Sequence, residues 1–174
     1  MADLAPVEVT NLDGYGFPSL DWDRPRNWLV NDAAGPDLPF FLNTVGEDGR
    51  PHSAGIGARW LDGDLTIVTG PRARKTRNLL ANPACTVTVR LGDIDLVMEG
   101  TAVRTTDPAV VAEAVLRYQE VGWPAVVDGD TITAPYSAPS AGPPPWHLYL
   151  FTFHTAFGVA TAQPSGATRW RFDR

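Results

Sequence analysis

Alternating apolar and polar residues run through the middle of the chain and predict a β-rich protein. Residues 64–69 (DLTIVT) alternate apart from the adjacent Ile67 and Val68, which is typical of a strand with one buried face. Asp-Gly pairs at 48–49 and 62–63 separate the first three runs and are typical of tight hairpin turns. The strands expected from these patterns are residues 40–45, 52–61, 64–69, 84–91, 94–106, 146–160 and 168–172.

Helical patterns are short and fall between the predicted strands. Asp23 followed by Pro25 predicts one helix start, and a second helix opens near Arg74 and stops at Pro83. Asp107 and Pro108 form an N-cap and first-turn pair for a third helix, whose apolar residues recur at helical spacing.

These patterns indicate a fold that is mainly β, of the α+β class. We expect one domain over residues 1–174, built as a small split barrel of about six antiparallel strands with short helices. Residues 1–38 are expected to form an N-terminal arm and helix. Residues 122–145 form a long Gly/Pro-rich excursion, and a connection of that length in a compact domain is usually functional or interfacial.

Composition limits the classes of partner. The 174-residue chain has a formal net charge of −6 and a pI near 4.9, which argues against nucleic acid because binding to a phosphate backbone needs a basic surface. No apolar run approaches the ~20 residues that span a bilayer, so no membrane partner is expected. Cys85 is the only cysteine, which excludes an internal disulfide and fits a reducing, cytoplasmic location.

Several familiar catalytic and cofactor motifs are absent from the sequence. It contains no phosphate-binding P-loop, and GIG at 55–57 is not part of a Rossmann fingerprint. The histidines at 52, 147 and 154 are too few and too scattered to predict a metal site. Cys85 lies in an apolar strand pattern, which favours a small core residue over a nucleophile.

One segment contrasts with the acidic composition. Residues 69–79 (TGPRARKTRNL) contain Arg72, Arg74, Lys75 and Arg77, and Lys75 is the only lysine in the chain. The segment joins a predicted strand to a predicted helix. A helix N-terminus presents unpaired N–H groups and the positive end of the helix dipole, so cations there are unfavourable unless an anion binds. The segment therefore predicts an anion site, against the alternative of a solvated basic surface.

The stretch 48–89 resembles the pyridoxamine-phosphate-oxidase-like split β-barrel family, which also includes flavin and deazaflavin oxidoreductases. The matching pieces are Asp48-Gly49-Arg50-Pro51, the Thr69…Arg74-Lys75 motif, Asn78-Leu79, and Asn82-Pro83 before the next strand. The resemblance covers residues 40–106 well and the rest loosely. It implies a split barrel, usually a homodimer, that holds a flavin phosphate through the Thr/Arg/Lys motif and the flavin ring at the dimer interface.

Carried over position by position, the resemblance assigns phosphate contacts to the cationic segment and ring contacts to the strand before it. Arg59 falls where the oxidase has a phosphate-contacting lysine. The cofactor-binding residues implied in this way are Ile56, Gly57, Arg59, Thr69, Arg72, Arg74, Lys75 and Asn78.

Two positions depart from the family pattern. Ala73 stands where the oxidase has a serine before the Arg-Lys pair, and Ala54 stands where it has an arginine. Both differences remove donors on the phosphate side. The C-terminus also lacks the arginine and histidine that bind the vitamin B6 substrate, so vitamin B6 oxidation is not expected.

Two cofactors stay open, FMN and the deazaflavin coenzyme F420. FMN has one phosphate, for which Arg74, Lys75 and backbone donors suffice. F420 has a longer anionic tail, to which the additional charges of Arg72 and Arg77 are suited. Because successive helical residues point about 100° apart, the four cations cannot all face one phosphate.

The sequence thus predicts an FMN- or F420-dependent oxidoreductase that moves hydride to a small organic acceptor. The cofactor would do the redox chemistry, so no acid or base in the protein is strictly required. Trp123 and Trp146 flank the excursion and are candidates for a pocket, and His52 is a candidate proton donor. The alternatives are a non-catalytic flavin carrier or sensor, and a haem-binding relative with His52, His147 or His154 as axial ligand.

Overall fold

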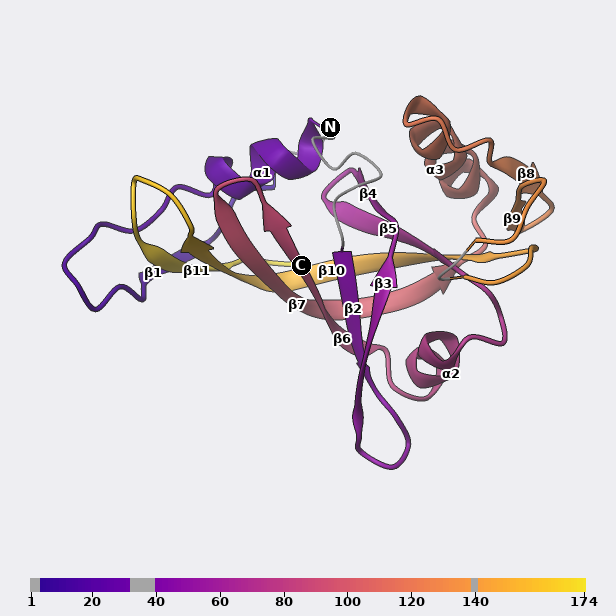
Figure 1. Cartoon of the computed structure of the whole chain (residues 1–174), viewed down its shortest axis with the longest axis horizontal. Coiled ribbons are helices and arrows are strands. Elements are labelled where there is room, and N and C mark those ends of the chain that lie inside the picture. The colour runs from indigo at the N-terminus through magenta and orange to yellow at the C-terminus, as the bar shows by residue number, and fades with distance from the viewer. Residues whose placement is uncertain (1–3, 32–39, 139–140) are drawn as a thin grey trace.

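The computed structural model describes residues 4–31, 40–138 and 141–174, so residues 33–39, whose Gly/Pro-rich sequence predicts the end of the first helix, lie outside the described residues. Figure 1 shows a long, twisted antiparallel sheet with helices at its margins. The elements are β1 (Glu8–Asn11), α1 (Asp23–Val30), β2 (Phe40–Val45), β3 (Pro51–Ile56), β4 (Ala58–Leu61), β5 (Asp64–Thr69), α2 (Arg74–Ala81), β6 (Ala84–Leu91), β7 (Ile94–Thr105), α3 (Pro108–Glu120), β8 (Val126–Asp128), β9 (Thr131–Thr133), β10 (His147–Ala160) and β11 (Ala167–Arg171).

The long strand β10 organises the barrel. It pairs with β7 over 148–160 and with β5 over 147–151 on its other side. From β7 the pairing continues through β6 and β2 to β3, and β5 pairs with β4. Because β3 and β4 are consecutive parts of one strand, the circuit β2–β3/β4–β5–β10–β7–β6 closes. The fold is therefore the split barrel of about six antiparallel strands, with short helices, that the sequence predicts.

The sequence predicted one continuous strand over residues 52–61, but the structure divides this segment into β3 and β4. The strand parts at Gly57: Ile56 is paired with Phe40 of β2, whereas Ala58 is paired with Ile67 of β5. A Cβ at Gly57 would meet no heavy atom within 4 Å, so the space beside the break is open. In the described part of the chain β3 pairs only with β2, and its other edge has no partner strand.

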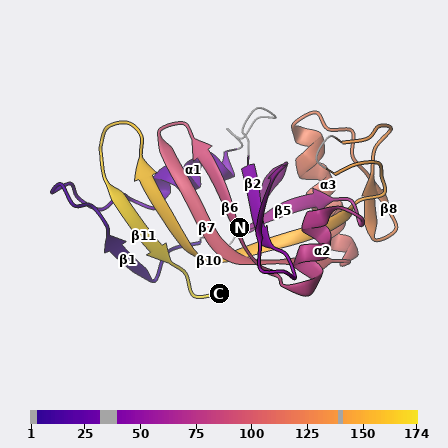
Figure 2. The ribbon, with the colours of Figure 1, turned by 60° about the horizontal axis from the view of Figure 1, so that its bottom comes forward.

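Two apolar clusters stabilise this arrangement. The first fills the barrel and extends to α1 and α2. The second lies outside the barrel, where α3 and the β8–β9 hairpin cover Val68 of β5 and Leu148 of β10. Figures 1 and 2 show α2 and α3 near the same end of the sheet, with β1 and β11 at the opposite end.

The 122–145 excursion is a folded cover in its described part. The hairpin β8–β9 was not expected from the sequence. Ile132 of β9 exchanges two backbone hydrogen bonds with Trp146, of 2.9 and 2.8 Å, and Gln119 of α3 donates a side-chain hydrogen bond to the Ala125 carbonyl. These contacts tie the excursion to both α3 and the start of β10.

The helix starts agree with the sequence expectations. Asp107 caps α3 by accepting hydrogen bonds from the backbone N–H groups of Ala109 (2.8 Å) and Val110 (3.5 Å). α1 begins at Asp23 and α2 at Arg74. Within the described ranges, no helix has the length and apolar character needed to cross a membrane.

Gly100 of β7 lies opposite an irregularity in the pairing of β10. The register of β10 shifts between Phe153 and Thr155, across from Gly100 and Glu99 of β7. A Cβ at Gly100 would approach the Phe153 Cα to 2.6 Å and would overlap the Thr152 carbonyl. The close approach of two backbones therefore requires glycine here.

Replacing Gly100 with alanine should lower the free energy of unfolding by about 1–3 kcal/mol, because backbone atoms of β10 would have to move. Urea denaturation followed by circular dichroism measures the change. Thr101→Ala, at the exposed neighbouring position, is the matched control and should be close to neutral. Equal stability of the two variants would show that the strands are not in such close contact.

Candidate functional site

The cationic segment folds as a turn followed by α2, which covers the end of the barrel beside β2. Asn78 of α2 is buried, and its side-chain N–H donates to the Thr44 hydroxyl of β2 at 2.8 Å. Leu79 belongs to the barrel core. Asn78, predicted as a cofactor contact, thus fastens the helix to the barrel in this structure.

Thr69 at the end of β5 is also fully buried. The Thr76 hydroxyl donates to the Gly70 carbonyl at 2.7 Å and lies 3.2 Å from the Thr69 hydroxyl. Because Thr76 has already given its hydroxyl hydrogen to Gly70, Thr69 must be the donor of the second bond. The Thr69 hydroxyl therefore secures the turn that begins α2.

The start of α2 carries positive charge and has no cap. Ala73 is the N-cap residue and makes no side-chain cap hydrogen bond, and the first turn, all of it described, contains no acidic residue. Arg74 is exposed, whereas Lys75 is only 4% exposed, and burial lowers the pKa of its amine. Two cations at the positive end of a helix dipole disfavour the helix unless an anion lies beside them.

His52 shares this end of the barrel. It is paired with Thr44 in the β2–β3 register, and Thr44 is the residue that holds Asn78 of α2. Burial, followed by the charges of Arg74 and Lys75, lowers the pKa of His52. Its Nδ1 is buried and has no hydrogen-bond partner among the described residues. A two-residue turn at Asp48-Gly49 would pair His52 with Val45 and not with Thr44, so the sequence did not place His52 beside α2.

Arg59 lies in a different place from the α2 cations. It is paired with Thr66 of β5, whose hydroxyl contacts the Tyr118 hydroxyl of α3 at 3.2 Å. Thr69 is three residues further along β5, about 10 Å away, and odd and even residues of a strand point to opposite faces. The structure therefore does not bring Arg59 together with Thr69, although the family resemblance implied that both contact one phosphate.

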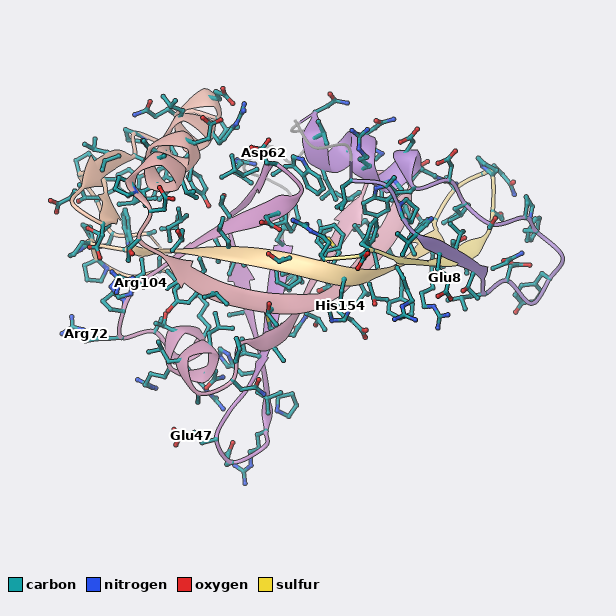
Figure 3. The ribbon with its side chains drawn as sticks, turned by 180° about the vertical axis from the view of Figure 1, so that it is seen from behind. Glu8, Glu47, Asp62, Arg72, Arg104 and His154 are labelled. Atoms are coloured by element: carbon teal, nitrogen blue, oxygen red, sulfur yellow. The ribbon has the colours of Figure 1, made fainter. Side chains whose placement is uncertain are left out.

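Two clefts meet at Ala141, between the α2 start and α3. The first, here called the N-cap cleft, has a volume of about 550 Å³ and opens at the N-cap of α2. Its lining residues are Gly70, Pro71, Arg72, Ala73, Ala141, Gly142, Pro143, Pro144 and Pro145. Figure 3 shows the Arg72 side chain projecting outward at this end of the molecule, with Arg104 nearby.

The second cleft, here called the aromatic cleft, has a volume of about 510 Å³. It contains two residues predicted from the sequence, Gly57 and Arg59, together with Trp123 from the excursion. Trp146, the other pocket candidate, is fully buried, and its indole N–H donates to the Gly142 carbonyl at 3.0 Å. The lining residues are Gly57, Arg59, Val68, Tyr118, Val121, Gly122, Trp123, Tyr136, Ala138 and Ala141.

The histidines do not form one site. His147 is paired with Thr69, and His154 is exposed with Nδ1 2.9 Å from the Thr155 hydroxyl. In Figure 3 His154 lies well away from Arg72. Among the described residues, no group of three or more His, Cys, Asp or Glu side chains could hold a metal ion. Cys85 is buried with a free thiol, and burial raises its pKa to about 12.

A family model described as pyridoxamine 5'-phosphate oxidase matches residues 37–159. No curated protein matches the chain. Among solved structures, an FMN-binding protein of Nostoc punctiforme related to pyridoxamine 5'-phosphate oxidase is similar with a TM-score of 0.56 and 15% identity. That match covers 90% of this chain and 99% of the Nostoc chain.

Two further structures share the fold. An F420 reductase is similar with a TM-score of 0.51 and 22% identity, over 75% of this chain and 94% of its own. A heme binding protein of Mycobacterium smegmatis has a TM-score of 0.56 and 13% identity, over 86% of this chain and 59% of its own.

The titration of His52 tests the geometry of this end of the barrel. We expect its pKa, measured from the imidazole proton shifts by NMR, to lie below that of an exposed histidine, so the ring is neutral at pH 7. Arg74→Gln combined with Lys75→Gln should raise it, because two positive charges that disfavour the imidazolium are removed. Arg50→Gln, at an exposed position of the adjacent turn, is the control. A His52 pKa that does not respond to the double change would contradict the placement.

Proposed function

The chain belongs to the pyridoxamine 5'-phosphate oxidase family, and from this premise we propose that it is an FMN- or F420-dependent oxidoreductase acting on a small organic acceptor. The observation that carries the proposal is the start of α2, where Arg74 and the buried Lys75 flank an uncapped helix N-terminus. That combination is suited to a phosphate group, whose negative charge the helix dipole and the two cations would stabilise.

The residues present fit such a cofactor. Its phosphate would lie against Arg74 and Lys75, the two residues that follow Ala73 of the N-cap cleft. The flavin ring would lie along the unpartnered edge of β3, where the backbone of Ile56 and Gly57 offers hydrogen-bond donors and acceptors to the polar edge of the ring. Thr69 and Asn78 would support the site indirectly, because their side chains hold α2 in place.

Arg72 is the residue whose use would distinguish FMN from F420. It is exposed and lines the N-cap cleft, and its carbonyl accepts a 3.2 Å hydrogen bond from Arg77. FMN would leave both arginines unused, whereas the longer anionic tail of F420 would extend past Arg72. The similarity to an FMN-binding protein and to an F420 reductase supports both choices.

Either cofactor, when bound in its reduced form, would supply the hydride with its two electrons and become oxidised, and solvent would supply the proton that completes reduction of the acceptor. The protein's own residues bind, orient and exclude water. Tyr118 is unsuited to proton transfer, because its hydroxyl donates to the Thr66 carbonyl at 3.1 Å and burial raises its pKa to about 12. The lone, buried Cys85 fits the cytoplasmic location that forms part of the proposal.

The proposal includes a homodimer that packs through the outer face of the barrel. A row of paired residues crosses that face: Phe41 of β2, Thr88 of β6, Val97 of β7 and Phe157 of β10. Phe41 is 43% exposed and Val97 is 37% exposed, so an apolar strip is open to solvent. The row begins at Gly55 of β3, and a partner there would border the proposed ring position.

A haem-binding function is the second candidate, supported by the similarity to the heme binding protein of Mycobacterium smegmatis and by the half-buried His52 and His147. An absorption spectrum after incubation with hemin would then show a Soret band that shifts in His52→Ala or His147→Ala.

A flavin carrier or sensor would bind the cofactor, but enones or quinones added to the reduced cofactor on the protein would not be reduced.

Changing Arg74 to Gln, or Lys75 to Met, should each weaken FMN binding by at least about tenfold, the value of a lost charge-assisted hydrogen bond. Binding of riboflavin, which lacks the phosphate, should change little. Fluorescence quenching of both flavins measures the two affinities. Arg90→Gln, an exposed control at the far end of β6, should leave both unchanged. Equal losses of affinity for FMN and riboflavin would contradict a phosphate role.

Arg72→Gln distinguishes the two cofactors, because it should weaken the binding of F420 and leave the binding of FMN unchanged.

If the outer face is a dimer interface, wild-type protein should sediment with twice the mass of the 18.8 kDa chain. Val97→Asp should shift it toward the monomer, because a carboxylate would be buried without a partner. Val126→Asp, at an exposed position on β8, is the matched control and should stay dimeric. A wild-type monomer that binds flavin at full affinity would rule out a shared site.

A further inference from the structure

The aromatic cleft has features that a phosphate and flavin ring do not require. It lies between the outer face of β4–β5, the C-terminal end of α3 and the excursion. Of the described residues that line it, Arg59 is the only charged one, and the others are apolar, aromatic or glycine. A mostly apolar cleft of about 510 Å³ with one charged side chain is typical of a small-molecule site.

Trp123, on the wall of this cleft, packs against two other aromatic rings. Trp123 contacts Tyr118 edge-to-face, with ring centroids 4.9 Å apart, and Trp146 at 5.3 Å. Tyr118 is in turn held by Thr66, and Trp146 by the Gly142 carbonyl. Trp123 is therefore fixed from two sides, and Tyr136, 44% exposed, lies at the cleft as a second flat surface. Flat ligands stack well on such surfaces.

The charge of the cleft favours an anion. No acidic residue is among its described lining residues, and Tyr118 stays protonated at neutral pH. Arg59 presents a planar guanidinium, whose paired N–H donors match the two oxygens of a carboxylate. The neighbouring N-cap cleft adds Arg72 on the other side of Ala141.

We propose that the aromatic cleft binds flat, conjugated carboxylates, with the ring system against Trp123 and the carboxylate on Arg59. Such acids are then the acceptor class of the enzyme. This second step rests on the proposed function: Gly57 lines the cleft and also belongs to the proposed ring contact, so a molecule in the cleft lies beside the flavin.

Calorimetric titration of the cofactor-free protein with 2-naphthoate tests the site. The uncharged 2-naphthamide has the same shape and should bind at least about tenfold more weakly, since it lacks the charge that pairs with the guanidinium. Arg59→Met should weaken naphthoate to the level of the amide, and Arg59→Lys should recover part of the loss. Tyr136→Leu should weaken both ligands several-fold. Arg90→Met and Tyr15→Leu, which change exposed residues outside the cleft, are the matched controls.

Repeating the titration after loading with FMN separates the site from the cofactor. Naphthoate should bind as tightly as before, or more tightly, because the two molecules would occupy adjacent space. Competition between naphthoate and FMN would overturn the proposal, since the cleft would then be the position of the ring itself. Equal affinity for acid and amide, or no binding of either, would also overturn it. If naphthoate binds but neither flavin does, the binding site stands and its role as an acceptor site fails together with the proposed function.

Discussion

The structure depends on one strand that serves two partners. β3 pairs with β2 and β4 pairs with β5, and only their continuity through Gly57 closes the barrel. Because β2 and β5 are not neighbours, the strand must break between them. In the described part of the chain, the break leaves one edge of β3 without a paired strand. Unpaired backbone groups at a sheet edge must find other partners. The candidate site lies along this edge, between the start of α2 and the aromatic cleft.

The second requirement is a cation cluster held firmly in an acidic protein. Lys75 is nearly fully buried, so its charge stays at a fixed position, and Arg74 beside it is exposed to a ligand. The buried hydroxyls of Thr69 and Thr76 and the amide of Asn78 fix the helix that carries both. The motif therefore has two kinds of residue. Arg74 and Lys75 carry the charges that would bind an anion, and Thr69, Thr76 and Asn78 hold the helix in place. This division explains why the segment stays folded although its charges oppose the helix dipole.

The sequence predicted the strands well where a run has a clear end. The bounds of β2, β5 and β6 agree with those expected, because each of the three runs is followed directly by a glycine. The parting at Gly57 was missed, since a strand that changes partner keeps the same alternation. The β8–β9 hairpin was missed because three-residue strands are too short to show a period. The sequence could not place Arg59 and His52, because their positions depend on how the strands pair. The pairing separates Arg59 from Thr69 and brings His52 to α2, and linear spacing reveals neither.

The central claim is that a flavin lies along β3 with its phosphate at the start of α2. Amide chemical shifts of ¹⁵N-labelled protein, followed during titration with FMN, test it directly. We expect the largest changes at Ala73, Arg74 and Lys75 and along β3 at Ile56 and Gly57, with β1 and β11 at the opposite end of the sheet unaffected. Saturable FMN binding that leaves both the α2 start and Gly57 unchanged, and shifts residues elsewhere, would contradict it.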